Sequence, residues 1–203
     1  MSSMFKFKII VAWSKNVGKS SLIIRFCDNS FSEDKKDTIG VDFKRKKTLV
    51  DGVEADLIIW DFAGEERFRT LFPSYLNGAV GAFVLYDITN EDSLKDVTNW
   101  VKIIDQFAEP NVAKILIGTK KDLEPQRKVT RAAAANFVKK YHFVPESYET
   151  SSKTGEHVED AFAAMVRAII SRKFAKCPCC GNYEDIKIKI CRGCGSKIAC
   201  AVT

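Results

Sequence analysis

The sequence has no long apolar run and no secretory leader. No stretch of the 203 residues approaches the roughly 18 to 20 consecutive apolar residues that a helix needs to cross a bilayer. The first residues, Met1–Lys6, also lack the apolar core and the small-residue cleavage site of a signal peptide. These absences lead us to expect a cytoplasmic protein.

Cysteine is nearly absent from the first 174 residues, where only Cys27 occurs, and the other six cysteines crowd into the last segment. Charge is uneven too: residues 172–203 hold seven basic and two acidic residues, whereas the rest of the chain holds 25 and 24. Composition therefore predicts two parts, a body at 1–174 that is long enough for one full core and an appendage at 175–203.

Apolar, β-branched runs alternate with segments of helical spacing along the body. The expected strands are 5–12, 43–50, 55–60, 79–86 and 114–118, with a sixth before residue 151, and the expected helices are 19–27, about 90–107, about 131–141 and 156–174. Thr89 and Thr130 are the expected helix N-caps, and Asp51-Gly52 is the expected hairpin turn. This order predicts an α/β fold with a mostly parallel six-stranded sheet flanked by helices, in which ligands bind at the carboxyl ends of the strands.

The segment Trp13–Ser20 joins the first strand to the first helix. It matches the phosphate-binding pattern GxxxxGK[ST] at Gly18, Lys19 and Ser20, while Trp13 stands where the first glycine belongs. Such a loop directs successive backbone N–H groups at phosphates. Lys19 is expected to reach the β- and γ-phosphates, and Ser20 to bind Mg²⁺.

Three further motifs follow later strands in the order that a guanine-nucleotide site needs. Asp61–Gly64 fits DxxG, in which the carboxylate holds Mg²⁺ through water and the glycine N–H meets the γ-phosphate. Thr119–Asp122 places Lys120 along the base and Asp122 opposite the guanine N1–H and 2-amino groups, which adenine cannot supply. Ser151–Lys153 closes over the base. Four agreeing loops predict a guanine-nucleotide site.

With these motifs, residues 5–174 resemble the Ras superfamily of small GTPases, and Rab proteins most closely. Thr38–Phe43 resembles the first switch of Rab proteins, and Trp60–Arg69 resembles their second switch. Glu149–Gly155 is similar to the Rab ETSAKTG segment. The resemblance implies a P-loop GTPase domain that binds GTP or GDP with Mg²⁺, and partners that comprise an exchange factor, an activating protein and effectors.

The resemblance also assigns roles to individual residues. The implied nucleotide-binding set is Ser14, Lys15, Asn16, Val17, Gly18, Lys19, Ser20, Ser21, Phe31, Thr38, Gly64, Thr119, Lys120, Asp122, Ser151, Ser152 and Lys153. The implied Mg²⁺ ligands are Ser20, Thr38 and Asp61, and the implied catalytic residues are Glu65, Lys19 and Thr38. Phe43, Trp60 and Tyr75 stand where Rab proteins carry an aromatic triad that contacts effectors, although core packing alone would also account for them.

The sequence departs from the family pattern near the γ-phosphate. Trp13 replaces a glycine, and Lys15 adds a long cation. Glu65 replaces the glutamine that orients the attacking water, and an ionised glutamate can only accept hydrogen bonds. Since no arginine is evidently placed to act in cis, we expect slow, partner-dependent hydrolysis. Thr119 replaces the asparagine of NKxD, as in Rho proteins, which still bind guanine nucleotides.

The appendage carries two CxxCG knuckles. Cys177, Cys180, Cys191 and Cys194 have the spacing of a tetrahedral zinc site, in which the metal supplies the folding energy that so short a segment lacks. Ile186–Ile190 alternates with lysine and predicts a short strand between the knuckles. Disulfides are the alternative, and a cytoplasmic chain disfavours them. The sequence therefore predicts a zinc ribbon, with Cys179 as a spare thiol.

The role of this appendage is open. Cys200–Thr203 fits the prenylation pattern CaaX, but threonine is not a usual last residue. Without a lipid, the basic segment predicts only weak, peripheral contact with an anionic membrane. Nucleic acid is not an expected partner, because Tyr183 is the segment's one aromatic residue. The leading interpretation is a monomeric switch in trafficking or signalling. The alternative is an adaptor, nucleotide-bound or nucleotide-poor, whose ribbon binds protein or nucleic acid.

Overall fold

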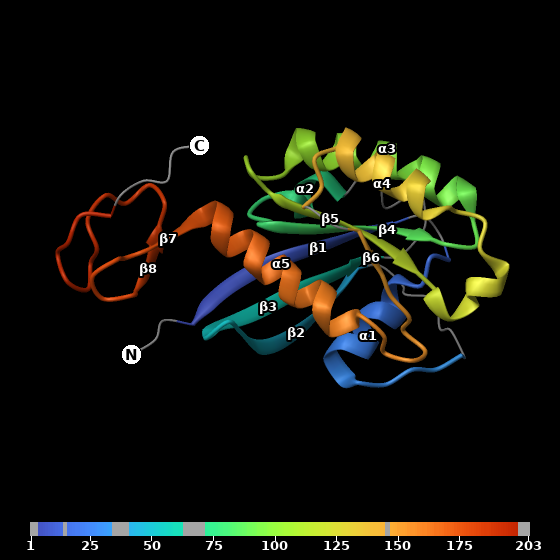
Figure 1. Ribbon diagram of the computed structural model, residues 1–203, viewed down its shortest axis with the longest axis horizontal. Helices are drawn as coiled ribbons and strands as arrows, with labels where there is room; N and C mark the ends of the chain where they lie inside the picture. The colour runs from blue at the N-terminus through green and yellow to red at the C-terminus, as the bar shows by residue number, and fades with distance from the viewer. Residues whose placement is uncertain (1–3, 14–15, 34–40, 63–71, 145–146, 199–203) are drawn as a thin grey trace.

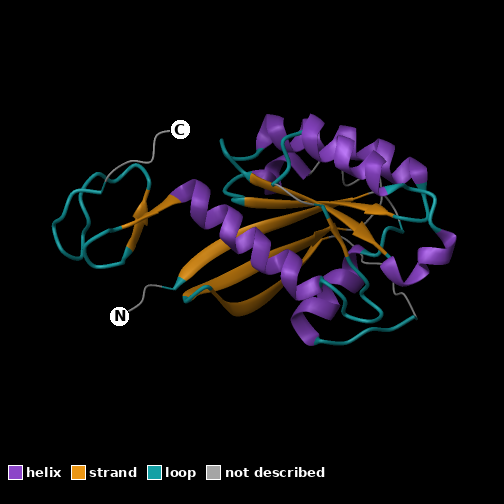
Figure 2. Cartoon of the chain, in the orientation of Figure 1, coloured by secondary structure: helices purple, strands orange, loops and turns teal. Residues whose placement is uncertain are grey.

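In the computed structural model, a central sheet lies between two layers of helices (Figures 1 and 2). The structure describes residues 4–13, 16–33, 41–62, 72–144 and 147–198. The strands of the main sheet are β1 (Phe5–Trp13), β2 (Val41–Val50), β3 (Val53–Phe62), β4 (Gly81–Asp87), β5 (Ala113–Thr119) and β6 (Tyr148–Glu149). The helices are α1 (Lys19–Asp28), α2 (Phe72–Leu76), α3 (Glu91–Phe107), α4 (Arg131–Lys140) and α5 (Val158–Lys173), with a 3₁₀ helix at Lys121–Gln126. None of the helices among these residues is long and apolar enough to cross a membrane.

The sheet has the order β2-β3-β1-β4-β5-β6, and only β2 runs antiparallel to its neighbour. The predicted α/β fold with a mainly parallel six-stranded sheet is therefore confirmed. β2 and β3 meet at a two-residue turn in which Asp51 and Gly52 both have positive φ, as predicted for this hairpin. Because β1, β3, β4, β5 and β6 are parallel, their carboxyl ends meet at one edge, and the predicted motifs follow at that edge.

One hydrophobic core joins the sheet to both helix layers. α1 and α5 lie on one face, and α2, α3 and α4 lie on the other (Figure 1). β4 and β5 are buried along their whole length, as their continuous apolar runs predict. The rings of Phe26 in α1 and Phe162 in α5 stack with centroids 3.6 Å apart, and Phe83 meets Phe162 edge-on. This aromatic stack fixes α1, which carries the phosphate-loop residues, against α5.

Two predictions about the ends of helices were wrong. Thr89 is not the N-cap of α3, because its N–H and hydroxyl both donate to Asp87 Oδ1 at the end of β4. Asn90 caps the helix instead, with Oδ1 accepting from the Asp92 N–H at 3.0 Å. Thr130 does cap α4, as predicted. The last helix begins at Val158, not Glu156, because the chain turns through Gly155 and His157, both at positive φ, and it ends at Lys173.

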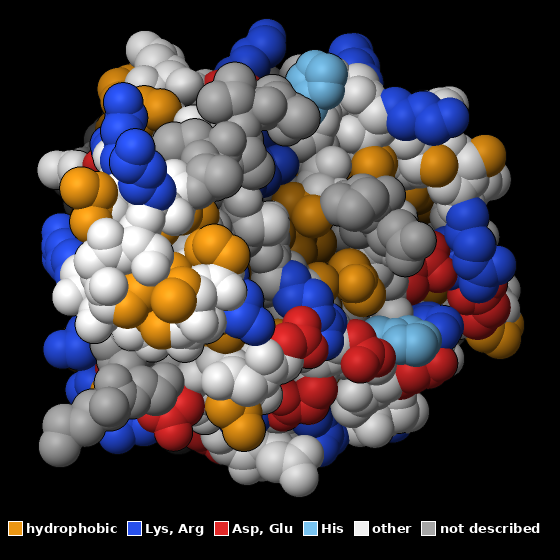
Figure 3. Space-filling model, turned by 60° about the vertical axis from the view of Figure 1, so that its left-hand side comes forward, with side chains coloured by type: hydrophobic (Ala, Val, Ile, Leu, Met, Phe, Trp, Pro, Cys, Tyr) orange, Lys and Arg blue, Asp and Glu red, His pale blue; other side chains and the backbone are white. Residues whose placement is uncertain are grey.

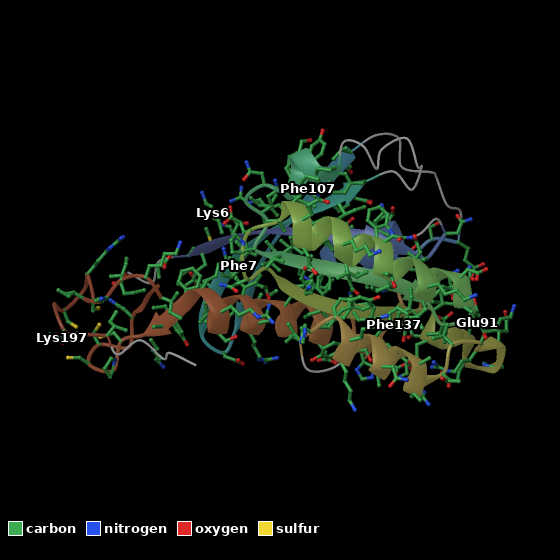
Figure 4. The ribbon with its side chains drawn as sticks, turned by 90° about the horizontal axis from the view of Figure 1, so that it is seen from above. Lys6, Phe7, Glu91, Phe107, Phe137 and Lys197 are labelled. Atoms are coloured by element: carbon green, nitrogen blue, oxygen red, sulfur yellow. The ribbon has the colours of Figure 1, made fainter. Side chains whose placement is uncertain are left out.

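The appendage contains a second, two-stranded sheet, β7 (Phe174–Lys176) and β8 (Tyr183–Asp185). The predicted strand at Ile186–Ile190 is wrong: the chain turns there, with the Ile188 N–H donating to Asp185 O and the Lys187 N–H to Asp185 Oδ1. Figure 4 shows Lys197 in the appendage at one end of the molecule and Glu91, just beyond the carboxyl end of β4, at the other. The appendage therefore lies far from the carboxyl edge of the sheet.

Candidate functional site

The phosphate-loop motif lies between β1 and α1, at the carboxyl edge of the sheet. Gly18 has φ 88° and directly precedes α1, a conformation that favours glycine, and Asn16 also has positive φ. No side chain caps α1, and its first turn holds no acidic residue. The N-terminus of such a helix suits a phosphate, because its backbone N–H groups and the helix dipole favour an anion. Ser14 and Lys15 lie outside the described residues.

Lys19, Ser20 and Asp61 come together beneath this loop. Lys19 is only 5% exposed, forms an ion pair with Asp61 at the end of β3, and donates to Ser20 Oγ at 3.1 Å. Burial lowers the pKa of Lys19 to about 7, and the charge of Asp42 opposes this shift. The ammonium thus holds together a hydroxyl and a carboxylate, two oxygen ligands of the type that Mg²⁺ prefers. The donor set fits the implied Mg²⁺ site, although the third predicted ligand, Thr38, lies outside the described residues.

The base-recognition loops also meet. Asp122 Oδ1 accepts from the Ser151 hydroxyl at 2.6 Å, so the loops after β5 and β6 are bonded at the carboxylate predicted to read guanine. Lys120 adopts the left-handed conformation, and its ammonium lies 2.5 Å from Asp87 Oδ2. Asp87 was not predicted as a site residue, since its only sequence signal is its place at the end of a buried strand.

Thr119 connects the base loop to the phosphate loop. Its buried hydroxyl lies 2.6 Å from Val17 O and 3.0 Å from Tyr86 O. A single hydroxyl hydrogen can be donated to either carbonyl, and the shorter contact is the one to the phosphate loop. Threonine can therefore tie the two loops together at the position where NKxD proteins carry asparagine.

Thr119→Val is expected to lower the free energy of unfolding by about 1–3 kcal/mol, because valine has the same shape and leaves a buried carbonyl unpaired. Urea unfolding of the two chains measures this difference. The control is Thr154→Val, at an exposed threonine whose hydroxyl makes one hydrogen bond within the described part of the chain, accepting from the Glu156 N–H at 3.3 Å. Equal unfolding midpoints for Thr119→Val and the wild-type chain would contradict a structural role for the Thr119 hydroxyl.

The loop Ser151–Lys153 is bonded to α1 as well. Arg25 donates to Ser152 O at 2.6 Å and to Lys153 O at 2.8 Å. Sequence reasoning missed Arg25, because its partners are backbone carbonyls and carry no residue signature. Ser21 lies in α1, and Phe31 is half-buried in the chain that follows α1. Gly64 and Glu65 lie outside the described residues, so their predicted roles stay predictions.

The three aromatic residues of the predicted partner surface lie in a row. The ring centroids of Phe43 and Trp60 are 5.8 Å apart, and those of Trp60 and Tyr75 are 5.4 Å apart. Phe43 is 59% exposed, whereas Trp60 and Tyr75 are half-buried and pack against the core. The triad is thus partly core and partly surface, with Phe43 as its exposed end.

The four knuckle cysteines converge in the appendage. Their Sγ atoms all lie within 4.8 Å of one another, with Cys177 3.6 Å from Cys194 and Cys180 3.4 Å from Cys191. A disulfide needs sulfurs about 2.05 Å apart, whereas four thiolates about 2.3 Å from one zinc ion are separated by about 3.8 Å. The cluster therefore has the size of a tetrahedral metal site. Cys179 is exposed and does not belong to it.

The two knuckles have the same backbone hydrogen bonds. The Cys177 N–H donates to Asn182 O and the Gly181 N–H to Cys177 O; the Cys191 N–H donates to Ser196 O and the Gly195 N–H to Cys191 O. Gly181 and Gly195 both have positive φ, near 75°, which explains the glycine after each cysteine pair. Hydrogen bonds from Ser196 lower the pKa of Cys194, whereas burial raises the pKa of Cys191. Two equivalent turns thus present four sulfurs to one point.

Comparison with known proteins agrees with this geometry over the body of the chain. The Ras family profile matches residues 8–171. The chain belongs to the Ras family. It is 45% identical over 166 residues to "GTP-binding protein yptV2" of Volvox carteri, covering 81% of this chain and 76% of that protein. It is 41% identical over 168 residues to human "Ras-related protein Rab-4B" (83% and 78%), and 40% identical over 186 residues to "Ras-related protein RABD2a" of Arabidopsis thaliana (92% and 90%). This Ras-family protein is therefore a Rab-like small GTPase, an enzyme that hydrolyses GTP.

Proposed function

We propose that this Rab-like GTPase is a slow switch that depends on exchange and activating partners and carries a zinc ribbon directly after its last helix. The main support is the meeting of its phosphate and base loops at one edge of the sheet, through the Thr119–Val17 and Ser151–Asp122 hydrogen bonds. Lys19, Ser20 and Asp61 supply the phosphate and Mg²⁺ contacts. Bound GTP and GDP therefore define the two states of the switch.

Slow turnover follows from the residues expected near the γ-phosphate. Glu65 can accept a hydrogen bond from water but, when ionised, cannot donate one to the phosphoryl group. By analogy with family members, an intrinsic rate on the order of 10⁻⁴ to 10⁻² per second is expected, and an arginine supplied by a partner would accelerate it.

Glu65→Gln is expected to raise the intrinsic rate, because glutamine restores a donor and removes a negative charge beside the phosphates. Single-turnover release of phosphate from labelled GTP measures both chains. The control is Glu54→Gln, a charge-matched change at an exposed position of β3. An unchanged or lower rate for Glu65→Gln, with GTP binding intact, would show that Glu65 already performs the role of the usual glutamine.

For the appendage we propose one structural zinc ion on Cys177, Cys180, Cys191 and Cys194. The local core consists of two of these cysteines and Ile198, with Ala175 against it, which is too little apolar surface to fold alone. The predicted boundary between body and appendage, at 174/175, lies within β7, after its first residue. Phe174 itself packs on Phe5 of the body, with ring centroids 4.6 Å apart, so the ribbon is attached to the body directly.

Charge limits what this ribbon binds. Zinc with four thiolates carries a net charge of −2, which offsets much of the excess positive charge of residues 175–198. On the face shown in Figure 3, lysine and arginine side chains are mixed with acidic and hydrophobic ones and form no continuous basic surface. We therefore propose at most a weak membrane contact.

The exposed Phe43 end of the aromatic triad is the proposed contact for effectors. Cys200, the cysteine of the CaaX match, lies outside the described residues.

A further inference from the structure

Arg25 makes an unusual set of hydrogen bonds for a surface helix residue. Its Nε donates to Ser152 O at 2.6 Å, and Nη2 donates to Lys153 O at 2.8 Å. The remaining nitrogen, Nη1, donates to Asn29 O and Oδ1 at the end of α1. The rigid guanidinium thus holds two consecutive carbonyls of a loop 127 and 128 residues away in the sequence.

This contact determines where the amides of that loop point. In a trans peptide the C=O and N–H groups point in opposite directions. Because the Ser152 carbonyl points at Arg25, the Lys153 N–H points away from it. The Ser151 carbonyl accepts from the Gly155 N–H, which orients the Ser152 N–H in turn.

These two amides are unpaired next to the base-reading carboxylate. Among the described residues, neither the Ser152 N–H nor the Lys153 N–H has a hydrogen-bond partner. The same loop donates the Ser151 hydroxyl to Asp122. If Asp122 takes the N1–H and 2-amino groups of guanine, the 6-oxo oxygen on the same edge of the base needs donors, and the loop offers two.

We infer that Arg25 is a positioning residue for the guanine base, which holds the Ser152–Lys153 peptides so that their amides donate to the 6-oxo oxygen. The inference rests on the proposed nucleotide site. Arg25 belongs to the helix that begins with Lys19 and Ser20, so one rigid element sets both the phosphate contacts and the base-loop conformation. Arg25 thereby slows nucleotide release without touching the nucleotide.

The first test is the release of fluorescently labelled GDP from the full chain in excess Mg²⁺. Arg25→Ala is expected to speed release by about tenfold, because it removes two charge-assisted hydrogen bonds that hold the loop. Arg25→Lys can reach one carbonyl at a time, so its rate of GDP release should lie between those of Arg25→Ala and the wild type. Because it keeps the positive charge, it also serves as the test if alanine impairs folding. The matched control is Arg167→Ala, which removes a two-pronged arginine contact to Asp51 and should change release less than about twofold.

The second test separates positioning from general loosening of the fold. The probe is 6-thioguanosine diphosphate, which keeps the N1–H and 2-amino groups that Asp122 reads but carries a sulfur, a much weaker hydrogen-bond acceptor, in place of the 6-oxo oxygen. Arg25→Ala should weaken GDP binding by about tenfold and binding of this analogue by less than about twofold. Equal losses for both ligands, or no loss for GDP, would overturn the role of Arg25. A wild-type chain that binds no GDP would instead overturn the nucleotide site on which the inference rests.

Discussion

Asp122→Asn is expected to change the base preference of this GTPase from guanine to xanthine. The aspartate accepts from both the N1–H and the 2-amino group of guanine, whereas asparagine offers one acceptor and one donor. Xanthine presents the matching pair, an N1–H and a 2-oxo oxygen. Loss of a buried polar match costs binding by about 10² or more, so GDP affinity should fall, and xanthosine diphosphate affinity should rise, by at least that factor. Competition against labelled GDP and labelled xanthosine diphosphate measures both.

The control for this switch is Asp92→Asn, which makes the same change from carboxylate to amide at the exposed start of α3, where Asp92 pairs with Lys95. It should leave both affinities unchanged. If Asp122→Asn keeps its guanine preference, Asp122 does not read the base, and the assignment of the loop after β5 is wrong.

Cys191→Ser is expected to abolish zinc binding and unfold the ribbon. Cys191 is 1% exposed, and its N–H and C=O both hold the second knuckle, so serine removes a ligand at the centre of the cluster. Structural zinc sites of this kind contribute about 10 kcal/mol or more to folding. Zinc content by elemental analysis should fall from about one ion per chain to near zero, and backbone amides of 175–198 should lose protection against hydrogen exchange.

The chain supplies its own control, Cys179→Ser, at an exposed thiol two residues from Cys177 and outside the cluster. This variant should retain its zinc and its protected amides. Protection that survives both Cys191→Ser and chelation would show that the ribbon folds without metal. Because Phe5 and Phe7 contact Phe174, loss of the ribbon should also weaken protection at the start of β1.

Much of the fold could be predicted because local pattern and tertiary environment agree. The run ending in Val84, Leu85 and Tyr86 is fully buried in β4, and it is apolar because no side of that strand meets water. Asp51-Gly52 fixed the hairpin, since both residues tolerate positive φ. The site motifs were predictable for the same reason: each needs a particular residue type at a fixed distance from a strand end, as Thr119 and Asp122 illustrate.

The errors have physical causes that sequence does not reveal. Thr89 has the side chain of an N-cap, but its hydroxyl is turned toward Asp87, to which it donates, and the side-chain oxygen of Asn90 accepts from the helix instead. The alternation of isoleucine and lysine at Ile186–Ile190 resembles a strand. The strands of the appendage are instead residues 174–176 and 183–185, because the cysteine cluster sets the path of the chain. Arg25 was missed because it binds carbonyls more than 120 residues away in the sequence. The helix α2 was not predicted because its five residues are too few to show a helical period.

Native mass spectrometry of the purified full chain tests the central claim most directly, because it weighs nucleotide and metal on one molecule. The account predicts a mass equal to the chain plus one guanine nucleotide with Mg²⁺ and one zinc ion, and loss of zinc but not nucleotide in Cys191→Ser. A chain that carries zinc but stays empty when GTP and Mg²⁺ are added would contradict the switch and favour an adaptor that acts through its ribbon.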